Sequence, residues 1–256
     1  MRKPVLVASA LFFASISWSQ EEQMDLPAYR PDPKIIREAL LPPSRFGMLL
    51  FDLFEYHVTS DEKEALYDVE FWYGGDFNRL WIETEGEHSF EKGEGTLERL
   101  DLYYARLITP FWDFRIGVGT SSVYGDVSES RTYGVVGFQG LAPYWFEVDA
   151  NLRVDTEGKV SADLEVEYDL LFTQRLILQP RLETLVAFSD IPDVGIWSGV
   201  NNLELGARLR YEIRREFAPY VGVSWTTYFG KARDMRRSAG EDTSVFNLLL
   251  GVRMWF

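Results

Sequence analysis

Residues 201–230 have the sequence NNLELGARLRYEIRREFAPYVGVSWTTYFG, in which apolar and polar side chains alternate. Every odd-numbered residue from Leu203 to Ile213 is apolar, whereas the even-numbered residues between them are charged or glycine. Neighbouring side chains of a β-strand point to opposite faces, so this period of two predicts a strand with one apolar and one charged face. After a short turn at 214–216 the chain returns with the same alternation, which predicts a hairpin.

The same alternation continues along most of the chain from residue 46 onward. It is regular in 144–154, 161–170 and 246–256, and it slips near Phe54 in the first segment. Alternating segments that are bounded by turn residues are typical of antiparallel strands. We expect about twelve strands, at 46–57, 66–75, 77–86, 97–108, 111–120, 131–140, 143–154, 160–172, 174–187, 201–214, 216–229 and 243–256.

Short and long connections follow one another between the predicted strands. Tight turns are expected around Asp76, Thr109–Pro110, Leu141–Ala142, Thr173 and Arg215. Longer polar loops are expected at 58–65, 87–96, 121–130, 155–159, 188–200 and 230–242. This asymmetry is typical of outer-membrane barrels, whereas a soluble barrel or a β-sandwich has no need of it. We therefore expect an all-β fold, an antiparallel transmembrane β-barrel of about twelve strands with short periplasmic turns and longer outer loops.

The composition agrees with a bacterial envelope protein. The 256 residues include no cysteine, 15% of them are aromatic, and the net charge is −14. This negative charge argues against nucleic acid as a partner and favours cations. No segment after the N-terminal region has the ~18 consecutive apolar residues of a membrane-spanning helix, so we expect any membrane-embedded structure to be a barrel.

The first 45 residues differ from the alternating sequence that follows them. Arg2 and Lys3, the apolar run 5–16 and the small residues around Trp18 predict a secretory signal peptide at 1–19, with an N-terminal membrane anchor as the alternative. Residues 20–45 are predicted to be a periplasmic segment, either a disordered lead-in or a short helix or plug at the barrel mouth. The barrel itself is predicted at 46–256.

Charged side chains are predicted to fill the inner face of the barrel. A barrel of twelve strands encloses a narrow interior, in which opposite charges should pair across strands. The simpler interpretation is a structural ladder of ion pairs, and the alternative is a cation path lined by carboxylates. The residues expected to face inward are Glu70, Glu83, Glu85, Asp113, Arg115, Glu147, Asp149, Arg153, Asp163, Glu165, Glu167, Arg175, Arg181, Glu183, Glu204, Arg208, Arg210 and Arg253.

Candidate catalytic groups are few. His57 and His88 are the two histidines of the chain, and both are predicted at the long-loop end of the barrel, with Ser60 and Ser89 near them in sequence. Nothing around them has the spacing of a hydrolase triad, and neither a phosphate-binding loop nor a metalloprotease motif is present. We therefore expect no enzymatic activity, and a barrel hydrolase remains the alternative.

Several segments resemble the copper resistance protein B family of bacterial outer-membrane proteins. They are GGDFNRLWIETEGE (74–87), ARLITPFWDFRIGV (105–118), GLAPYWFEVDA (140–150), LLFTQRLILQPRLE (170–183), LGARLRYEIRREFAPYVGV (205–223) and AGEDTSVFNLLLGVRMWF (239–256). The resemblance covers residues 46–256 in order. It implies an outer-membrane barrel that acts in copper tolerance, with membrane lipid, copper ions and periplasmic copper-resistance proteins as its partners.

The same resemblance implies copper as the bound metal, but the chain departs from the family at its N-terminus. Family members carry an extension rich in methionine and histidine, whereas residues 20–45 hold one methionine and no histidine. Copper binding or passage would then depend on the charged lumen, in which Arg153, Arg175 and Arg181 are the cations expected to neutralise the acidic wall. The candidate metal ligands are Glu147, Asp149, Asp163, Glu165, Glu167, Met24, Met48 and His57. A structural or nonspecific small-pore barrel without copper specificity is the alternative.

The predicted topology can be tested on intact cells. An epitope tag inserted at 188–200 or at 230–242 should be accessible to an external antibody, because these segments are predicted to be outer loops. A tag at 140–143 should be labelled only after the cells are permeabilised. Surface labelling at 140–143 would reverse the predicted orientation of the barrel.

Overall fold

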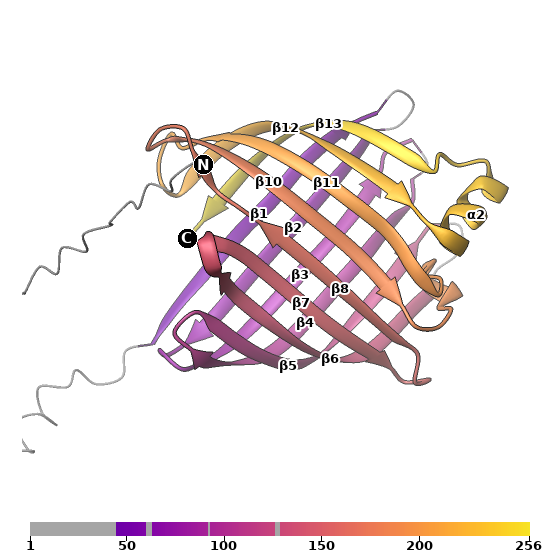
Figure 1. Cartoon of the computed structure of the whole chain (residues 1–256), viewed down its shortest axis with the longest axis horizontal. Coiled ribbons are helices and arrows are strands. Elements are labelled where there is room, and N and C mark those ends of the chain that lie inside the picture. Colours follow the sequence, from indigo (N-terminus) through magenta and orange to yellow (C-terminus); the bar gives the residue numbers. More distant parts are fainter. Residues whose placement is uncertain (1–44, 60–62, 92, 126–128) are drawn as a thin grey trace, which may run out of the picture. The chain divides into compact units, whose positions relative to one another are not determined.

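The computed structural model describes residues 45–59, 63–91, 93–125 and 129–256. The predicted signal peptide at 1–19 and residues 20–44 of the predicted N-terminal segment, with Met24, lie outside the described residues. Strands account for nearly all of the described chain. They form a closed antiparallel barrel, which confirms the predicted fold class (Figure 1).

Each strand of the barrel pairs with its neighbours in the chain, and β13 closes the ring against β1. The short strands β8 and β9 both pair with β10, so together they occupy one of the twelve strand positions around the barrel. The strands are β1 (Phe46–Val58), β2 (Lys63–Gly74), β3 (Asn78–Ser89), β4 (Gly95–Thr109), β5 (Trp112–Tyr124), β6 (Glu129–Ala142), β7 (Phe146–Asp155), β8 (Val160–Glu167), β9 (Leu170–Leu171), β10 (Leu176–Ala187), β11 (Gly199–Tyr211), β12 (Phe217–Tyr228) and β13 (Ser244–Trp255).

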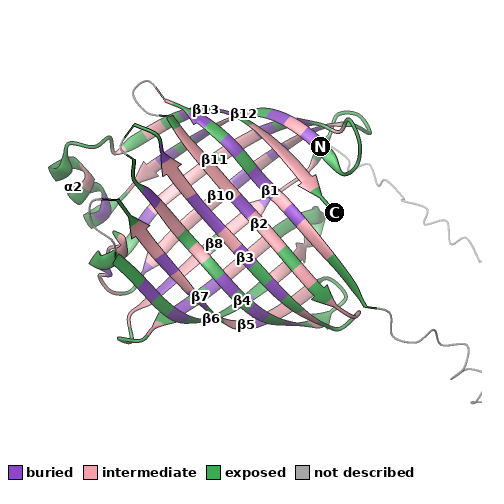
Figure 2. Ribbon diagram, turned by 180° about the vertical axis from the view of Figure 1, so that it is seen from behind, coloured by how far each residue is buried: buried purple, intermediate pink, exposed green. Residues whose placement is uncertain are grey.

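The hairpin of β11 and β12 has the two faces that the alternation predicts. Leu205 and Leu209 are exposed on the outside of the barrel, whereas Arg208 and Arg210 are buried on the inside. A Cβ atom at Gly206 would lie 2.7 Å from Nη1 of Arg208, so the glycine leaves space for the guanidinium on the inner face. Buried and exposed residues alternate in this way along most strands (Figure 2). The apolar face is therefore the lipid-facing surface, and the charged face lines the lumen.

A β-bulge explains the irregular alternation near Phe54. The pairing of β1 with β2 shifts between Phe51 and Leu53, and Asp52 and Leu53 are both buried. A bulge places two residues of one strand opposite one residue of its partner, so two consecutive side chains can lie toward the same side. Asp52 thus lies on the inner face that Leu50 occupies, and the bulge turns the residues from Leu53 onward to that face as well.

Some of the outer connections are shorter than the sequence predicts, because hairpin pairing continues beyond several predicted strand ends. The connections 90–94 and 156–159 are short, whereas 188–198 and 229–243 remain long. The second long connection contains helix α2 (Gly230–Ala239), although a loop was expected at 230–242. At the other end, residues 143–145 form the turn η1 (Pro143–Trp145) rather than the start of a strand. Tyr144 and Trp145 both have positive φ there.

Helix α2 lies at the end of the barrel opposite the C-terminus (Figure 1). Its Lys231 donates a 2.5 Å hydrogen bond to Asp190 in the 188–198 connection, which contains η2 (Pro192–Val194). This bond and the backbone N–H of Ser198 hold the pKa of the Asp190 carboxyl below its ordinary value. Arg236 stacks over the ring of Tyr228, 4.1 Å from its centroid. The two long outer connections are thus tied to each other and to the barrel wall.

None of the helices within the described ranges combines the length and the apolar character that crossing a membrane requires.

Exposed aromatic residues gather at the ends of the strands. Near the periplasmic turns, Phe77, Phe111, Tyr144 and Trp145 are all more than half exposed, at 66%, 56%, 83% and 69%. Aromatic girdles of this kind lie at the membrane interfaces of outer-membrane barrels. Trp72, by contrast, stacks on Trp81 inside the barrel with ring centroids 6.2 Å apart.

The lipid-facing side of β11 can be tested by measuring the free energy of unfolding. Leu205→Arg should destabilise the barrel by about 2–4 kcal/mol, because Leu205 lies near the middle of the strand and a charge there faces the centre of the bilayer. Leu209→Arg should cost less, since residue 209 lies nearer the periplasmic turn. Leu205→Met, the matched apolar control, should cost less than about 1.5 kcal/mol.

Urea titration of the variants, refolded into lipid vesicles, gives this order directly. Equal effects for the two arginine variants and the methionine control would mean that the outer face of β11 is not in contact with lipid.

Candidate functional site

Carboxylates stand directly opposite one another across several strands of the inner wall. Asp149 pairs with Glu165, Glu165 with Glu183, and Glu183 with Glu204, so one row of four carboxylates runs across β7, β8, β10 and β11. Like charges in directly opposed positions destabilise a sheet unless another charge compensates them. The inner wall therefore needs cations between its carboxylates.

Arg181 supplies much of that compensation on the β8–β10 wall. Its guanidinium lies 2.7 Å from Glu165, 3.3 Å from Glu183 and 3.6 Å from Glu167. The sequence-based expectation of Arg181 as a neutralising cation agrees with these contacts. Arg175, by contrast, is exposed in the turn that follows β9 and makes no ion pair with the described part of the chain.

Two further arginines bind carboxylates across neighbouring strands. Arg115, fully buried, pairs with Glu83 and with Asp149 and lies over the ring of Tyr103. Arg153 pairs with Asp163 and donates a 3.1 Å hydrogen bond to Asp101. Asp101 has no exposed surface and also accepts hydrogen bonds from Tyr103 and Tyr133, at 2.7 and 2.8 Å. This part of the lumen is a solid polar core.

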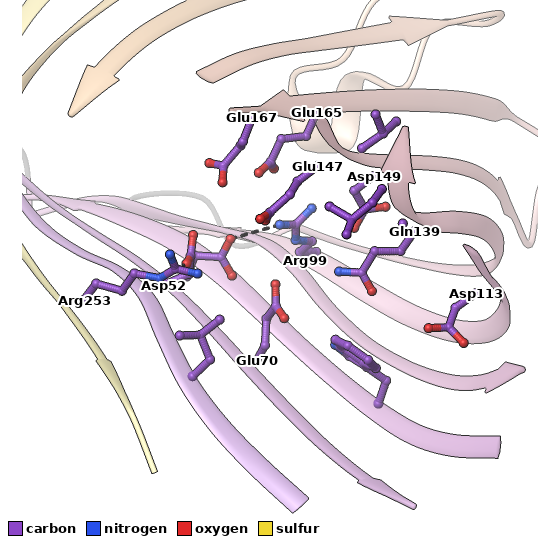
Figure 3. A pocket seen from close by; sticks show the side chains of 16 residues that line it. Asp52, Glu70, Arg99, Asp113, Gln139, Glu147, Asp149, Glu165, Glu167 and Arg253 are labelled. Atoms are coloured by element: carbon purple, nitrogen blue, oxygen red, sulfur yellow. Dashed lines mark hydrogen bonds and ion pairs between the residues drawn. The ribbon is translucent and has the colours of Figure 1, made fainter. Parts of the chain in front are cut away.

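A cavity of about 340 Å³ occupies the periplasmic half of the lumen (Figure 3). Residues from β1 and β2 line one side of it, and residues from β7 and β8 line the other. Its charged lining consists of Asp52, Asp68, Glu70, Arg99, Asp113, Glu147, Asp149, Glu165, Glu167 and Arg253. Carboxylates outnumber arginines in this lining, so the cavity is a region of negative charge.

Two of these carboxylates have no cationic partner at bonding distance. Neither Glu70 nor Glu147 makes a hydrogen bond or ion pair among the described residues, and Figure 3 shows both pointing into the cavity from different walls. Asp68 is 3% exposed, and one of its oxygens, Oδ1, is buried without a hydrogen-bond partner in the described structure. Its other oxygen accepts a 3.1 Å hydrogen bond from Arg99. The unpaired oxygens are where a cation would be held.

The structure brings only part of the predicted ligand set together. Glu147, Asp149, Glu165 and Glu167 line the cavity as one wall, as their positions on adjacent strands predict. Asp163 does not line it, because Arg153 and Asn151 bind its carboxylate.

The remaining predicted ligands lie elsewhere. His57 is buried in β1, where its Nε2 lies 2.6 Å from Glu55, and Glu55 also accepts a 2.6 Å hydrogen bond from Arg208. Met48 pairs with Trp72 of β2 and is not among the residues that line the cavity. Met24 lies outside the described residues.

Of the carboxylates of the opposite wall, the sequence placed Glu70 on the inner face but missed Asp52 and Asp68. Asp68 shares the face of Glu70 and alternates with Val69 and Phe71, so the pattern alone could have identified it. Asp52 is harder to find in this way, because the bulge in β1 places it and the adjacent Leu53 on the same side and so interrupts the alternation.

A second group of three carboxylates lies farther toward the outer end. Oxygen atoms of Glu85, Glu98 and Glu183 all lie within 4.8 Å of one another. Glu98 was not predicted to face inward, because the pairing of β4 shifts between Leu97 and Leu100. The spacing is short enough for one cation to bridge the three side chains.

Comparison with known proteins assigns the chain to a family. Residues 45–256 match the family model described as copper resistance protein B precursor (CopB). Copper resistance protein B of Escherichia coli is 40% identical over 209 residues, which cover 82% of this chain and 69% of that protein. The copper resistance protein B homolog of Pseudomonas syringae pv. tomato (strain ATCC BAA-871 / DC3000) is 35% identical over 205 residues, with coverages of 80% and 68%.

Solved structures with the same fold are porins. The KdgM porin has a TM-score of 0.50 at 10% identity, and the NanC porin has a TM-score of 0.51 at 12% identity. Each match covers 82% of this chain and 99% of the porin chain. At these identities the likeness concerns the fold, which is that of a barrel in the bacterial outer membrane. The chain belongs to the copper resistance protein B family, and this membership supports a role in copper resistance.

Proposed function

We propose that this outer-membrane barrel contributes to copper tolerance by binding copper ions in its lumen and passing them through it. The observation that carries the proposal is the cavity of about 340 Å³, into which Glu70 and Glu147 point without a cationic partner. A copper ion would be the cargo of this site, held by carboxylates from both walls. The buried Asp68 Oδ1, which has no hydrogen-bond partner in the described structure, adds a further acceptor oxygen.

The donor set favours the harder oxidation state of copper. Carboxylate oxygens suit divalent ions, whereas Cu(I) is selected by thioethers and thiolates. The described methionines are spread over β1, α2 and β13, at Met48, Met235 and Met254. We therefore expect weak Cu(II) binding that discriminates little against Zn(II). Binding should weaken as salt rises, because ions screen the attraction of a water-accessible cavity.

The alternative is a structural or nonspecific small-pore barrel without copper specificity. The paired arginines support it, since Arg115, Arg153 and Arg181 already neutralise much of the inner wall. In that case the charged ladder serves as the core of the barrel, and the unpaired carboxylates of the cavity attract any small cation.

We also propose that the barrel is not an enzyme. The Nε2 atom of His57 is engaged by Glu55, and the Nδ1 atom of His88 lies 3.4 Å from the Tyr124 hydroxyl. His88 stacks on the Tyr124 ring with centroids 6.0 Å apart. Both histidines thus have structural contacts, and the proposal does not require either of them for copper transport.

Isothermal titration of the purified full-length barrel with Cu(II) at two ionic strengths tests the copper site. The double variant Glu70→Gln/Glu147→Gln should bind Cu(II) about tenfold more weakly, equivalent to ~1.4 kcal/mol, because it removes the two unpaired charges of the cavity. The control Glu157→Gln removes a carboxylate from the outer connection after β7 and should bind as the wild type does. Zn(II) serves as the comparison ion.

Two results would contradict the proposal. One is Cu(II) binding that the double variant leaves unchanged. The other is a tight Cu(I) site that persists in Met24→Leu and Met48→Leu, which would show that other ligands hold the copper. Survival of a deletion strain on copper, complemented with the wild type or the double variant, then separates copper tolerance from a general pore function.

A further inference from the structure

One ion pair joins opposite sides of the barrel. Arg181 of β10 lies 3.9 Å from Glu85 of β3. Around the twelve strand positions of the barrel, β3 and β10 are six positions apart in either direction. The contact therefore spans the lumen along a diameter, whereas Arg115 and Arg153 bridge strands of one side.

A second close contact between the same two walls, this time among carboxylates, lies beside this ion pair. Glu85 and Glu98, from β3 and β4, have oxygen atoms within 4.8 Å of an oxygen of Glu183 on β10. Side chains from the two opposed walls thus meet near the middle of the strands. The periplasmic cavity adjoins this level of the lumen. Arg99 and Glu165 line the cavity and also contact Glu85 and Arg181 of the cross-lumen ion pair.

Both residues of the Arg181–Glu85 ion pair, which bridges the lumen, also make ion pairs on their own side of the barrel. On one side, Arg99 lies 3.1 Å from Asp68 and 3.1 Å from Glu85. On the other side, Arg181 is held by Glu165 and Glu183, and its side chain is 3% exposed. A buried guanidinium that loses its carboxylate partners has no solvent to replace them. Moving the Arg181 guanidinium away from its partners therefore costs free energy.

We infer that Arg99 and Arg181, bridged by Glu85, close the lumen at mid-height and select the ions that pass. The carboxylates at this level outnumber the two guanidinium groups. A cation that arrives among Glu85, Glu98 and Glu183 can take over the charge that Arg181 supplies there. Arg181 can then withdraw from Glu85 and Glu183 while it keeps its contacts with Glu165 and Glu167. Anions and neutral solutes provide no such replacement. The inference deepens the proposed function and rests on it only for the identity of the cation.

Conductance of the purified full-length barrel in planar bilayers, measured in potassium chloride without copper, tests the closure. Arg181→Ala should raise the conductance about tenfold over the wild type, because it removes the side chain that crosses the narrow lumen from β10 to Glu85 of β3. Its reversal potential in a salt gradient should shift further toward cation selectivity, since the carboxylates remain. Glu85→Ala removes the other end of the bridge and should also raise the conductance.

Two matched controls distinguish this effect from the loss of any arginine. Arg131→Ala removes a lumen arginine that pairs with Asp155 on the neighbouring strand, and Arg215→Ala removes an arginine of a periplasmic turn. Both should conduct much as the wild type does. Heat-modifiable mobility on gels verifies that each variant is folded.

Several outcomes would overturn the closure. Equal conductance of the wild type, Arg181→Ala and Glu85→Ala is one of them. If neither variant folds, the wild-type barrel decides: a large steady conductance, or passage of a neutral sugar into vesicles, contradicts a closed lumen. A closed wild type that excludes the sugar supports it. Copper binding is measured separately, so loss of the copper site would leave this result unaffected, and the reverse also holds.

Discussion

Charge neutralisation inside a space that holds little water is the constraint on which the barrel depends. Arg115 shows it most clearly, because the residue is fully buried and its guanidinium is held by Glu83, Asp149 and the face of Tyr103. An isolated buried charge is expensive, and a paired one is tolerated only when its remaining polar atoms are bound as well. The inner face therefore behaves as a polar core whose members hold one another in place.

Because buried charges need partners, carboxylates that lack an arginine indicate where the lumen could hold a cation. Asp149, Glu165, Glu183 and Glu204 form one row, and arginines neutralise only part of it. Where the arginines are absent, at Glu70 and Glu147, the wall keeps unpaired negative charge beside a cavity. This region of the lumen is therefore suited to cations. That property agrees with the role in copper resistance that the family membership supports. The central arginines set how freely an ion could leave that region.

The outer face obeys a different condition. Lipid provides no hydrogen bonds, so apolar side chains are favoured there, and the pairing of β13 with β1 joins the two ends of the sheet. Because Leu205 and Arg208 belong to one strand, the two conditions act on alternate residues of the same segment. That alternation is visible without coordinates, which is why twelve strands, their inward charges and the outer-membrane fold could be predicted.

What the sequence determined by itself is local: the period of two assigns Glu147, Asp149, Glu165 and Glu167 to one face of adjacent strands, and the structure places them there. Asp52 and Glu98 escaped it, because each lies at a shift in strand pairing, where the period of two is interrupted. The contact of Glu85 with Arg181 was decided only by the tertiary structure. The residues on β3 and β10 meet because ring closure sets the width of the lumen, and no local pattern contains that distance.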